Sequence, residues 1–141
     1  MTKVFIDGSA GTAGLRIHSR LEGRSDLELI TLSGEARKDP AARREALNSC
    51  GLAVLCLPDA ASRESVSMIE TPAVRVVDTS TAHRVAPGWA YGFPELGPER
   101  REAVISGKRV ASPGCHAGGF IVLVQPLIEA GCVGHHLFNV V

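Results

Sequence analysis

A short apolar segment near the start of the chain leads directly into a glycine-rich turn. Residues 3–7 are predicted to form a β-strand, Gly8, Gly11 and Gly14 follow, and apolar residues recur at helical spacing over 15–21. Glycine in such a turn lets the backbone bend tightly and approach a pyrophosphate group at the N-terminus of the next helix. The spacing is G-x-x-G-x-x-G rather than the commoner G-x-G-x-x-G. It predicts a dinucleotide-binding turn, and the alternative is a turn without a ligand.

Strand patterns and helical patterns continue to alternate along the chain. The predicted strands are 27–32, 52–57, 75–78 and 108–111, and the predicted helices are 41–48, 62–69 and 120–130, the last with a kink at Pro126. The run 52–57 is apolar throughout, which is typical of a parallel strand buried on both faces. The alternation predicts an α/β fold, a Rossmann-like doubly wound parallel sheet with helices on both faces. We expect Arg43 and Arg44 on a solvent-facing side of their helix, and residues 89–96 in an irregular loop.

The end of the second predicted strand bears on the choice of cofactor. In folds that prefer NAD, an acidic residue usually closes this strand and binds the ribose 2′-hydroxyl. Here Ser33 closes it, and Arg37 and Lys38 lie just beyond, which suits a 2′-phosphate and predicts NADP. Glu35 could reverse this preference, and a solvated charge cluster is the plain alternative. The candidate cofactor-binding residues are Gly8, Ser9, Gly11, Thr12, Ala13, Gly14, Ser33, Arg37, Lys38 and Pro58.

Polar residues also follow the strand 75–78. In a parallel sheet, ligands collect beyond the carboxyl ends of the strands, so the loop 79–84 is expected to line the site. Arg84 could bind a phosphate or carboxylate through two parallel hydrogen bonds. Ser80, His83 and Arg84 are therefore candidate substrate-binding residues, although His83 could equally be a surface or core histidine.

Cys115 occupies the junction between the last predicted strand and a helix. Pro113 and Gly114 make a turn there, and the unpaired N–H groups of a helix N-terminus favour a thiolate. Cys115 is thus a candidate covalent nucleophile, and the alternative is a small buried cysteine. The other cysteines, Cys50, Cys56 and Cys132, show no disulfide or zinc spacing, so reduced thiols and no metal are expected. Cys132 with His135 and His136 is too weak a cluster to change this.

Size and charge narrow the class of protein. The 141 residues fit one domain, and 15 basic residues balance 15 acidic ones. A formal net charge of zero argues against nucleic acid as the main partner. There is no apolar run of membrane-spanning length, and the N-terminus enters a strand pattern rather than a signal peptide. A cytoplasmic protein with a small-molecule substrate is expected.

Several of these segments together resemble a known enzyme family. Residues 3–14, 56–59, 78–84, 91–96 and 113–115 occur in the order seen in N-acetyl-gamma-glutamyl-phosphate reductases, and are most similar to the second, shorter type. The resemblance implies an NADP-dependent enzyme of arginine biosynthesis that converts N-acetyl-glutamyl 5-phosphate to N-acetyl-glutamate 5-semialdehyde. It also implies the mechanism: the Cys115 thiolate attacks the acyl phosphate, phosphate leaves, and hydride reduces the thioester to a thiohemiacetal that collapses to the aldehyde. Ser80 and Arg84 match a loop expected to line the site.

The chain departs from the family pattern at some points. His116 stands where the family usually has tyrosine, and Gly118-Gly119 weakens the first helical turn. Family members continue into a second domain that binds substrate, supplies the catalytic histidine and builds the subunit contact of a homo-oligomer. Neither His116 nor His135 matches that histidine. We therefore expect residues 1–141 to be the NADP-binding part that carries the cysteine, with little turnover alone.

Two alternatives remain open from the sequence. Aspartate-semialdehyde dehydrogenases share the cysteine-thioester chemistry, but their usual Asn-Cys-Thr is absent around Cys115. The chain could also be a non-catalytic NADP-binding or redox-sensing module, in which Cys115 is unreactive or only oxidisable.

Overall fold

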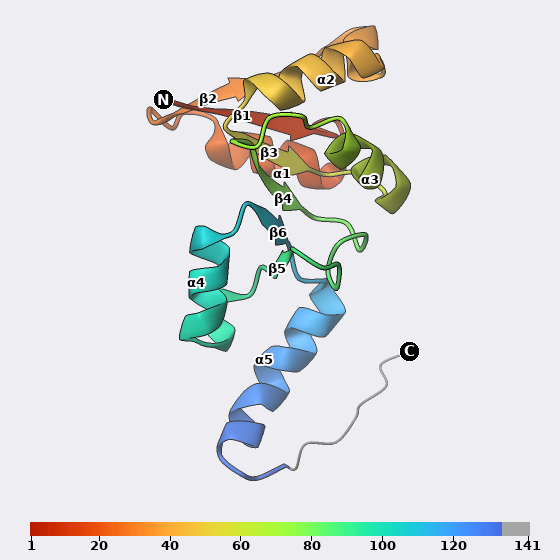
Figure 1. The fold of residues 1–141 in the computed structure, drawn as a ribbon. Helices are drawn as coiled ribbons and strands as arrows, with labels where there is room; N and C mark the ends of the chain where they lie inside the picture. The colour runs from red at the N-terminus through yellow and green to blue at the C-terminus, as the bar shows by residue number, and fades with distance from the viewer. Residues whose placement is uncertain (134–141) are drawn as a thin grey trace.

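The computed structural model describes residues 1–133, and Figure 1 shows the path of the chain. The strands are β1 (Thr2–Asp7), β2 (Leu27–Ile30), β3 (Leu52–Leu55), β4 (Arg75–Asp78), β5 (Ala90–Tyr91) and β6 (Arg109–Ala111). The helices are α1 (Thr12–Leu21), α2 (Pro40–Ser49), α3 (Asp59–Ser67), α4 (Pro98–Ser106) and α5 (Cys115–Glu129), with short 3-10 helices η1 (Gly34–Arg37) and η2 (Pro94–Leu96). His135 and His136, named above, lie outside the described residues.

The strands of residues 1–133 form one parallel sheet with the order β2-β1-β3-β4-β6-β5. The pairing register places the last residues of four neighbouring strands side by side. Asp7 pairs with Leu55, Leu55 pairs with Asp78, and Asp78 pairs with Ala111. The loops that follow β1, β3, β4 and β6 therefore leave the sheet along a single edge, as predicted for the ligand site.

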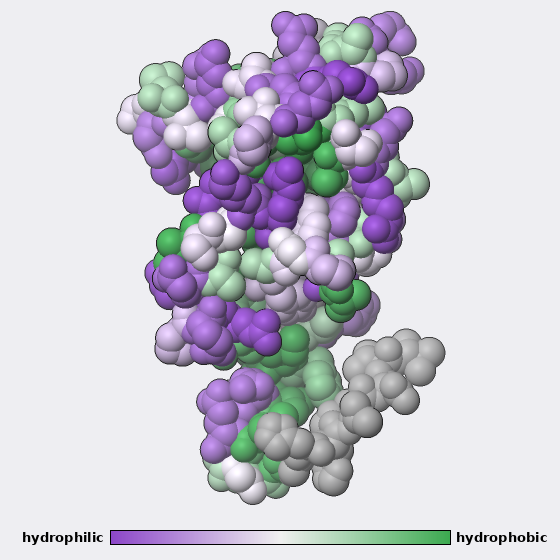
Figure 2. Space-filling model, in the orientation of Figure 1, coloured by the Kyte–Doolittle hydropathy of each residue, from purple (hydrophilic) through white to green (hydrophobic). Residues whose placement is uncertain are grey.

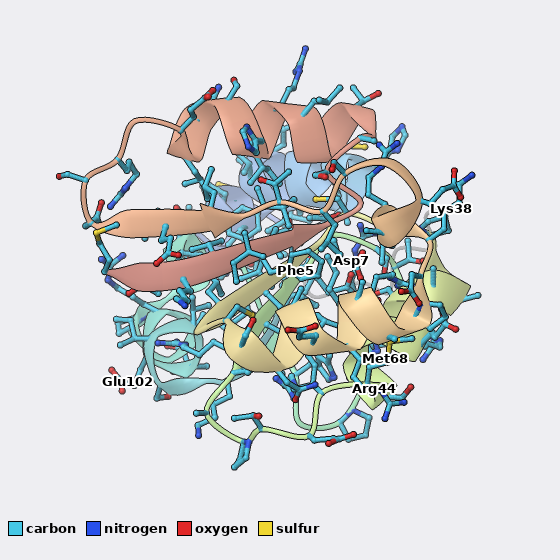
Figure 3. All side chains as sticks on the ribbon, turned by 90° about the horizontal axis from the view of Figure 1, so that it is seen from above. Phe5, Asp7, Lys38, Arg44, Met68 and Glu102 are labelled. Atoms are coloured by element: carbon cyan, nitrogen blue, oxygen red, sulfur yellow. The ribbon has the colours of Figure 1, made fainter. Side chains whose placement is uncertain are left out.

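Helices cover both faces of the sheet, which confirms the predicted fold class. On one face Phe5 and Leu55 pack against Leu47 of α2, in a cluster that also contains Met68. On the other face Val4, Ile6 and Val54 form a second cluster, against which Ile17 and Leu21 of α1 pack. Figure 3 shows the sheet between α1 and α2. Alternate residues of β1 thus enter different clusters, as the two-residue period of a strand requires.

The structure shifts several predicted bounds by two or three residues, as in α3, and differs most from the sequence-based expectation in three elements. The segment 89–96 is not wholly irregular, because β5 pairs in parallel with β6 and η2 follows it. Helix α4 was not expected, and it has no buried residue that would give an apolar stripe. Helix α5 begins at Cys115, well before the predicted start at Phe120. The prediction missed its first turns because Gly118 and Gly119 have low helix propensity.

Helix α5 also extends away from the sheet and remains poorly covered. Its side chains Val122, Leu123 and Leu127 are 60%, 73% and 46% exposed. In Figure 2 hydrophobic side chains gather over α5, whereas the surface over the sheet and α2 is mostly hydrophilic.

An amide side chain ties α2 to the segment that follows α3. Asn48 Nδ2 donates to the carbonyl oxygens of Arg44 at 2.9 Å and Met68 at 2.8 Å. Its Oδ1 accepts from the backbone N–H groups of Glu70 at 2.8 Å and Thr71 at 3.1 Å. One side chain therefore holds the C-terminal end of α2 against the segment that follows α3.

Replacing this amide should cost more stability than removing a neighbouring ion pair. We expect Asn48→Ala to lower the free energy of unfolding by about 1–3 kcal/mol, because two backbone N–H groups lose their acceptor. Arg44→Ala is the matched control, because the Arg44–Glu70 pair is exposed, and should cost less than about 1 kcal/mol. Urea unfolding followed by circular dichroism measures both, and equal losses would contradict the role given to Asn48.

Candidate active site

The glycine turn between β1 and α1 is built from close backbone contacts. Gly8 has a φ of +87°, and a Cβ there would lie 2.3 Å from the carbonyl oxygen of Cys56, at the end of β3. A Cβ at Gly14 would lie 2.3 Å from the carbonyl oxygen of Gly8. Gly11 is the N-cap of α1 and supplies no capping side chain. The turn therefore packs tightly while leaving the first N–H groups of α1 available to an anion.

Two adjoining cavities connect this turn to the predicted cofactor residues. The first, of about 440 Å³, is lined by Gly8, Ser9, Arg37 and Lys38 among others. The second, of about 480 Å³, shares Ser9 and Arg37 and adds Ser33. Their sizes suit parts of a nucleotide. The residues present therefore fit a dinucleotide: close backbone at the turn, free N–H groups at a helix N-terminus, and cations beside a cavity.

Thr12, Ala13 and Pro58 do not line either cavity, but they closely follow Ala10 and Leu57, which do. Thr12 and Ala13 form the first turn of α1, and Pro58 is the N-cap of α3. Glu35, the residue that could oppose a 2′-phosphate, has a side chain 92% exposed and lies 3.9 Å from the Lys38 ammonium.

A buried carboxylate at the end of β4 organises the next loop. Asp78 is fully buried. Its Oδ2 lies 2.6 Å from His83 Nδ1 and accepts a hydrogen bond from the Ser80 hydroxyl at 2.7 Å. Burial would raise the pKa of Asp78, but the hydrogen bonds from His83 and Ser80 hold it below its usual value. The His83 ring stacks on Trp89 with a centroid distance of 4.1 Å. Ser80 and His83 are thus buried and support the loop. For His83, this burial favours a core histidine over a substrate-binding one.

Arg84 connects this loop to the segment that carries the cysteine. Its Nε donates to the carbonyl oxygen of Ser112 at 3.1 Å, and its Nη2 donates to that of Thr79 at 3.3 Å. A Cβ at Gly114 would lie 2.6 Å from Arg84 Nη1. The guanidinium therefore packs against Gly114, in the space that a side chain at this position would occupy. Of the three predicted substrate residues, Arg84 is the one that the structure brings beside Cys115.

Cys115 is the first residue of α5, and its side chain is exposed. Its Sγ lies 3.8 Å from Nδ1 of His116. The N-cap Gly114 makes no side-chain hydrogen bond to the helix, so backbone N–H groups of the first turn remain free to interact with a thiolate. By contrast, burial raises the pKa of the Cys50 and Cys56 thiols. All four cysteines carry free thiols.

Sequence reasoning missed one pair of residues at this edge. Arg43 does not face solvent as predicted: its side chain is 11% exposed and lies 3.1 Å from the buried carboxylate of Asp7. The available signal was Asp7 itself, because an acidic residue closing an apolar strand needs a partner when it is buried. Arg44, in contrast, is exposed as expected.

Within residues 1–133 no cluster of three or more histidine, cysteine or acidic residues is arranged to hold a metal ion. Among the helices of the same residues, none has the length and apolar character needed to cross a membrane.

The sheet order, the glycine turn and the cavities beside it define a dinucleotide-binding domain of the Rossmann type, with an exposed cysteine on the same edge. Residues 3–104 match the family model of the semialdehyde dehydrogenase NAD-binding domain. The chain therefore belongs to the semialdehyde dehydrogenase family, and the predicted cofactor class agrees with its NAD-binding domain.

Relatives by sequence carry the name suggested by the motifs. The chain is 56% identical over 128 residues to an N-acetyl-gamma-glutamyl-phosphate reductase of Burkholderia cenocepacia, covering 91% of this chain and 41% of the relative. Identity and coverage are the same for N-acetyl-gamma-glutamyl-phosphate reductase 2 of Pseudomonas putida. The resemblance to this group is confirmed, and the chain spans about two fifths of the length of these relatives.

Solved structures share the fold at low sequence identity. Aspartate semialdehyde dehydrogenase from Francisella tularensis superposes with a TM-score of 0.68 at 16% identity, covering 93% of this chain and 42% of that one. The enzyme from Candida albicans, solved with NADP, gives 0.61 at 13% identity, covering 92% of this chain and 47% of that one.

Substitution by alanine is predicted to have opposite effects on stability at Gly14, which is closely packed in the glycine turn, and at Gly119, which is not. Gly14→Ala should lower the free energy of unfolding by about 2–4 kcal/mol, because the added methyl collides with backbone. Gly119→Ala should raise it by about 0.5–1 kcal/mol, because Gly119 lies in α5 with open space around its Cβ position. Urea unfolding tests both, and a stabilising Gly14→Ala would contradict the described turn.

The position of Cys115 predicts its rate of alkylation. Cys115 begins α5 and Cys132 lies just beyond the end of the same helix, and both are exposed. Because a helix N-terminus favours a thiolate and a C-terminus disfavours it, iodoacetamide at neutral pH should label Cys115 roughly five- to tenfold faster. Mass spectrometry of the two peptides measures the ratio, and Cys132→Ser is the control. Equal rates would argue for an unactivated thiol at position 115.

Proposed function

We propose that this chain is the NADP-binding and cysteine-bearing part of an N-acetyl-gamma-glutamyl-phosphate reductase. The observation that carries the proposal is the row of strand ends. The loop after β1 forms the glycine turn and the segment after β6 leads to Cys115, so cofactor site and nucleophile share one edge of one sheet. Relatives of this name at 56% identity support the substrate class.

The proposed chemistry begins at the Cys115 thiolate. Its sulfur attacks the carbonyl carbon of N-acetyl-glutamyl 5-phosphate, the S–C bond forms, and the C–O bond to phosphate breaks to give a thioester. A reduced cofactor held at the glycine turn would supply the hydride needed to reduce this thioester to a thiohemiacetal. The N–H groups at the start of α5 stabilise the thiolate and the oxyanion, and the S–C bond then breaks to release the semialdehyde.

Arg84 is proposed to assist the attack on the acyl phosphate because of where its charge is held. Two of its nitrogens are bound to the carbonyl oxygens of Ser112 and Thr79, which fixes the charge beside the segment that leads to Cys115. We propose that this charge attracts the phosphate of the substrate, while Asp78, Ser80 and His83 hold the loop beneath it. In this proposal His83 supports Arg84 and has no direct contact with substrate.

The preference for NADP over NAD rests on Arg37 and Lys38. Both line the cavity next to the glycine turn, and the exposed Glu35 side chain lies beside Lys38. We propose that these cations bind the 2′-phosphate of the cofactor. The aspartate semialdehyde dehydrogenases remain the second candidate, but they support only a shared fold at 13–16% identity.

The wider setting is also proposed from the family. We infer a small-molecule acyl phosphate as substrate, a cytoplasmic location, and a homo-oligomer for the longer protein. The relatives extend well beyond the matched part, and we propose that their remaining region supplies the substrate domain and the subunit contact. The 141-residue chain alone is then expected to bind NADP with little turnover of acyl phosphate, and an ordinary reductase rate from it would contradict this division.

A thermal-shift titration tests the cofactor. NADP should raise the melting temperature of this chain more than NAD at the same concentration, because a ligand that binds the folded state stabilises it by mass action. The double variant Arg37→Ala/Lys38→Ala should weaken NADP binding roughly tenfold or more and leave NAD binding unchanged. Arg100→Ala/Arg101→Ala removes the same charge from α4 and should change neither. A larger shift with NAD would overturn the NADP assignment.

A further inference from the structure

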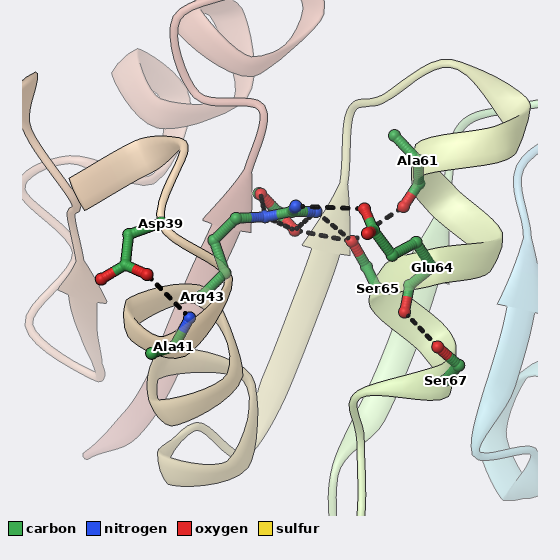
Figure 4. Close-up of polar contacts among 8 residues, drawn as sticks. Asp39, Ala41, Arg43, Ala61, Glu64, Ser65 and Ser67 are labelled. Carbon is green, nitrogen blue, oxygen red and sulfur yellow. Dashed lines mark hydrogen bonds and ion pairs between the residues drawn. The ribbon is translucent and has the colours of Figure 1, made fainter. Parts of the chain in front are cut away.

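Arg43 reaches from α2 across the end of β1 and meets three acceptors. Its Nε and Nη2 donate to the Asp7 carboxylate at 3.1–3.4 Å. Its Nη2 also donates to the Ser65 hydroxyl at 2.7 Å, and its Nη1 to Glu64 at 3.3 Å. Figure 4 shows Arg43 between α2 and these residues of α3. Every nitrogen of the guanidinium therefore already has a partner within the protein.

The same side chain forms part of the wall of the 440 Å³ cavity. Because most of the N–H groups along its edge are directed toward Asp7, Ser65 and Glu64, the flat face of the guanidinium is the main surface left for a ligand. A guanidinium face stacks well on a planar aromatic ring. Leu32, Leu57 and Ala61 line the same cavity and give it apolar walls, which suit a flat base.

The ion pair also removes an electrostatic obstacle. Asp7 directly precedes the glycine turn, and its carboxylate is 5% exposed. An unpaired carboxylate there would repel the phosphates of a dinucleotide. Burial would lower the pKa of Arg43, but Asp7 and Glu64 raise it above its ordinary value, so the guanidinium stays charged and neutralises Asp7. The Ser65 hydroxyl lies 2.8 Å from Asp7 and completes the pair.

The sheet order identifies which end of the cofactor this cavity takes. The cavity lies at the ends of β1, β2 and β3, where Leu32 and Leu57 follow the last two. Cys115 follows β6, which is separated from β3 by β4. The nicotinamide ring must lie near Cys115 to deliver its hydride, so the base in this cavity is the adenine.

We propose that Arg43 is a ligand-contacting residue of the cofactor site, and that the face of its guanidinium stacks on the adenine ring. The proposal rests on the dinucleotide binding proposed above. It gives α2 a role in binding that its sequence alone did not indicate, with Asp7 and Ser65 as the residues that hold the guanidinium in place.

The first test separates the two ends of the cofactor with two probes. Adenosine 2′,5′-bisphosphate represents the adenine end, and nicotinamide mononucleotide represents the other. Arg43→Lys keeps the charge but removes the planar face, and should weaken binding of adenosine 2′,5′-bisphosphate and of NADP about tenfold. Binding of nicotinamide mononucleotide should not change. Arg44→Lys, one residue along the same helix and exposed, is the matched control. Unchanged binding of adenosine 2′,5′-bisphosphate by a folded Arg43→Lys variant would overturn the proposal.

The second test uses the unsubstituted chain and does not depend on the folding of a variant. Adenosine 2′,5′-bisphosphate should move the NMR signal of Arg43 Nε–H upfield through the ring current of the stacked base, whereas ribose 5-phosphate, which lacks a base, should not. Binding of adenosine 2′,5′-bisphosphate without this shift overturns the stacking but leaves the proposed function intact. The shift together with equal affinity for NAD and NADP overturns the NADP preference but keeps the stacking. No binding of adenosine 2′,5′-bisphosphate overturns both.

Discussion

The parallel pairing of β1, β3, β4 and β6 is the constraint on which the site depends. Because the hydrogen-bond register puts Asp7, Leu55, Asp78 and Ala111 in one row, loops from distant parts of the sequence leave the sheet as neighbours. The glycine turn follows one end of this row, and the segment leading to Cys115 follows the other. No single loop builds the site, so its geometry is as rigid as the sheet that carries it.

Two of the four residues in that row are buried carboxylates, and both have the same kinds of hydrogen-bond partner. Asp7 pairs with Arg43 and with the Ser65 hydroxyl, whereas Asp78 pairs with His83 and the Ser80 hydroxyl. In each case a basic side chain and a serine satisfy the carboxylate, which is what a buried charge requires. The first cluster borders the cofactor cavity, and the second supports the loop that carries Arg84. The charges of these two carboxylates are therefore compensated locally.

The sequence predicted the alternation of elements because buried parallel strands are apolar runs and their turns carry glycine or proline. It did not predict β5, which has two residues and is too short for a period, or α4, which has no buried face. Candidate site residues could be proposed where the local sequence carries the chemistry, as at the glycine turn and at Cys115, and their roles stay predictions. Arg43 was assigned wrongly because its partner Asp7 lies 36 positions away, and only the pairing of β1 with β3 and the packing of α2 bring them together. His83 was left open for the same reason, since Trp89 and Asp78 meet it only in the folded chain.

The packing of Arg84 against Gly114 has a consequence for how this segment can change over evolutionary time. A side chain at position 114 would occupy the space of the guanidinium, so any larger residue there is tolerated only after Arg84 has been shortened or has moved. Loss of Arg84, in turn, leaves a gap next to the nucleophile as well as removing a charge. We therefore expect substitutions at the two positions to be coupled, so that the effect of a larger residue at 114 depends on the residue at 84.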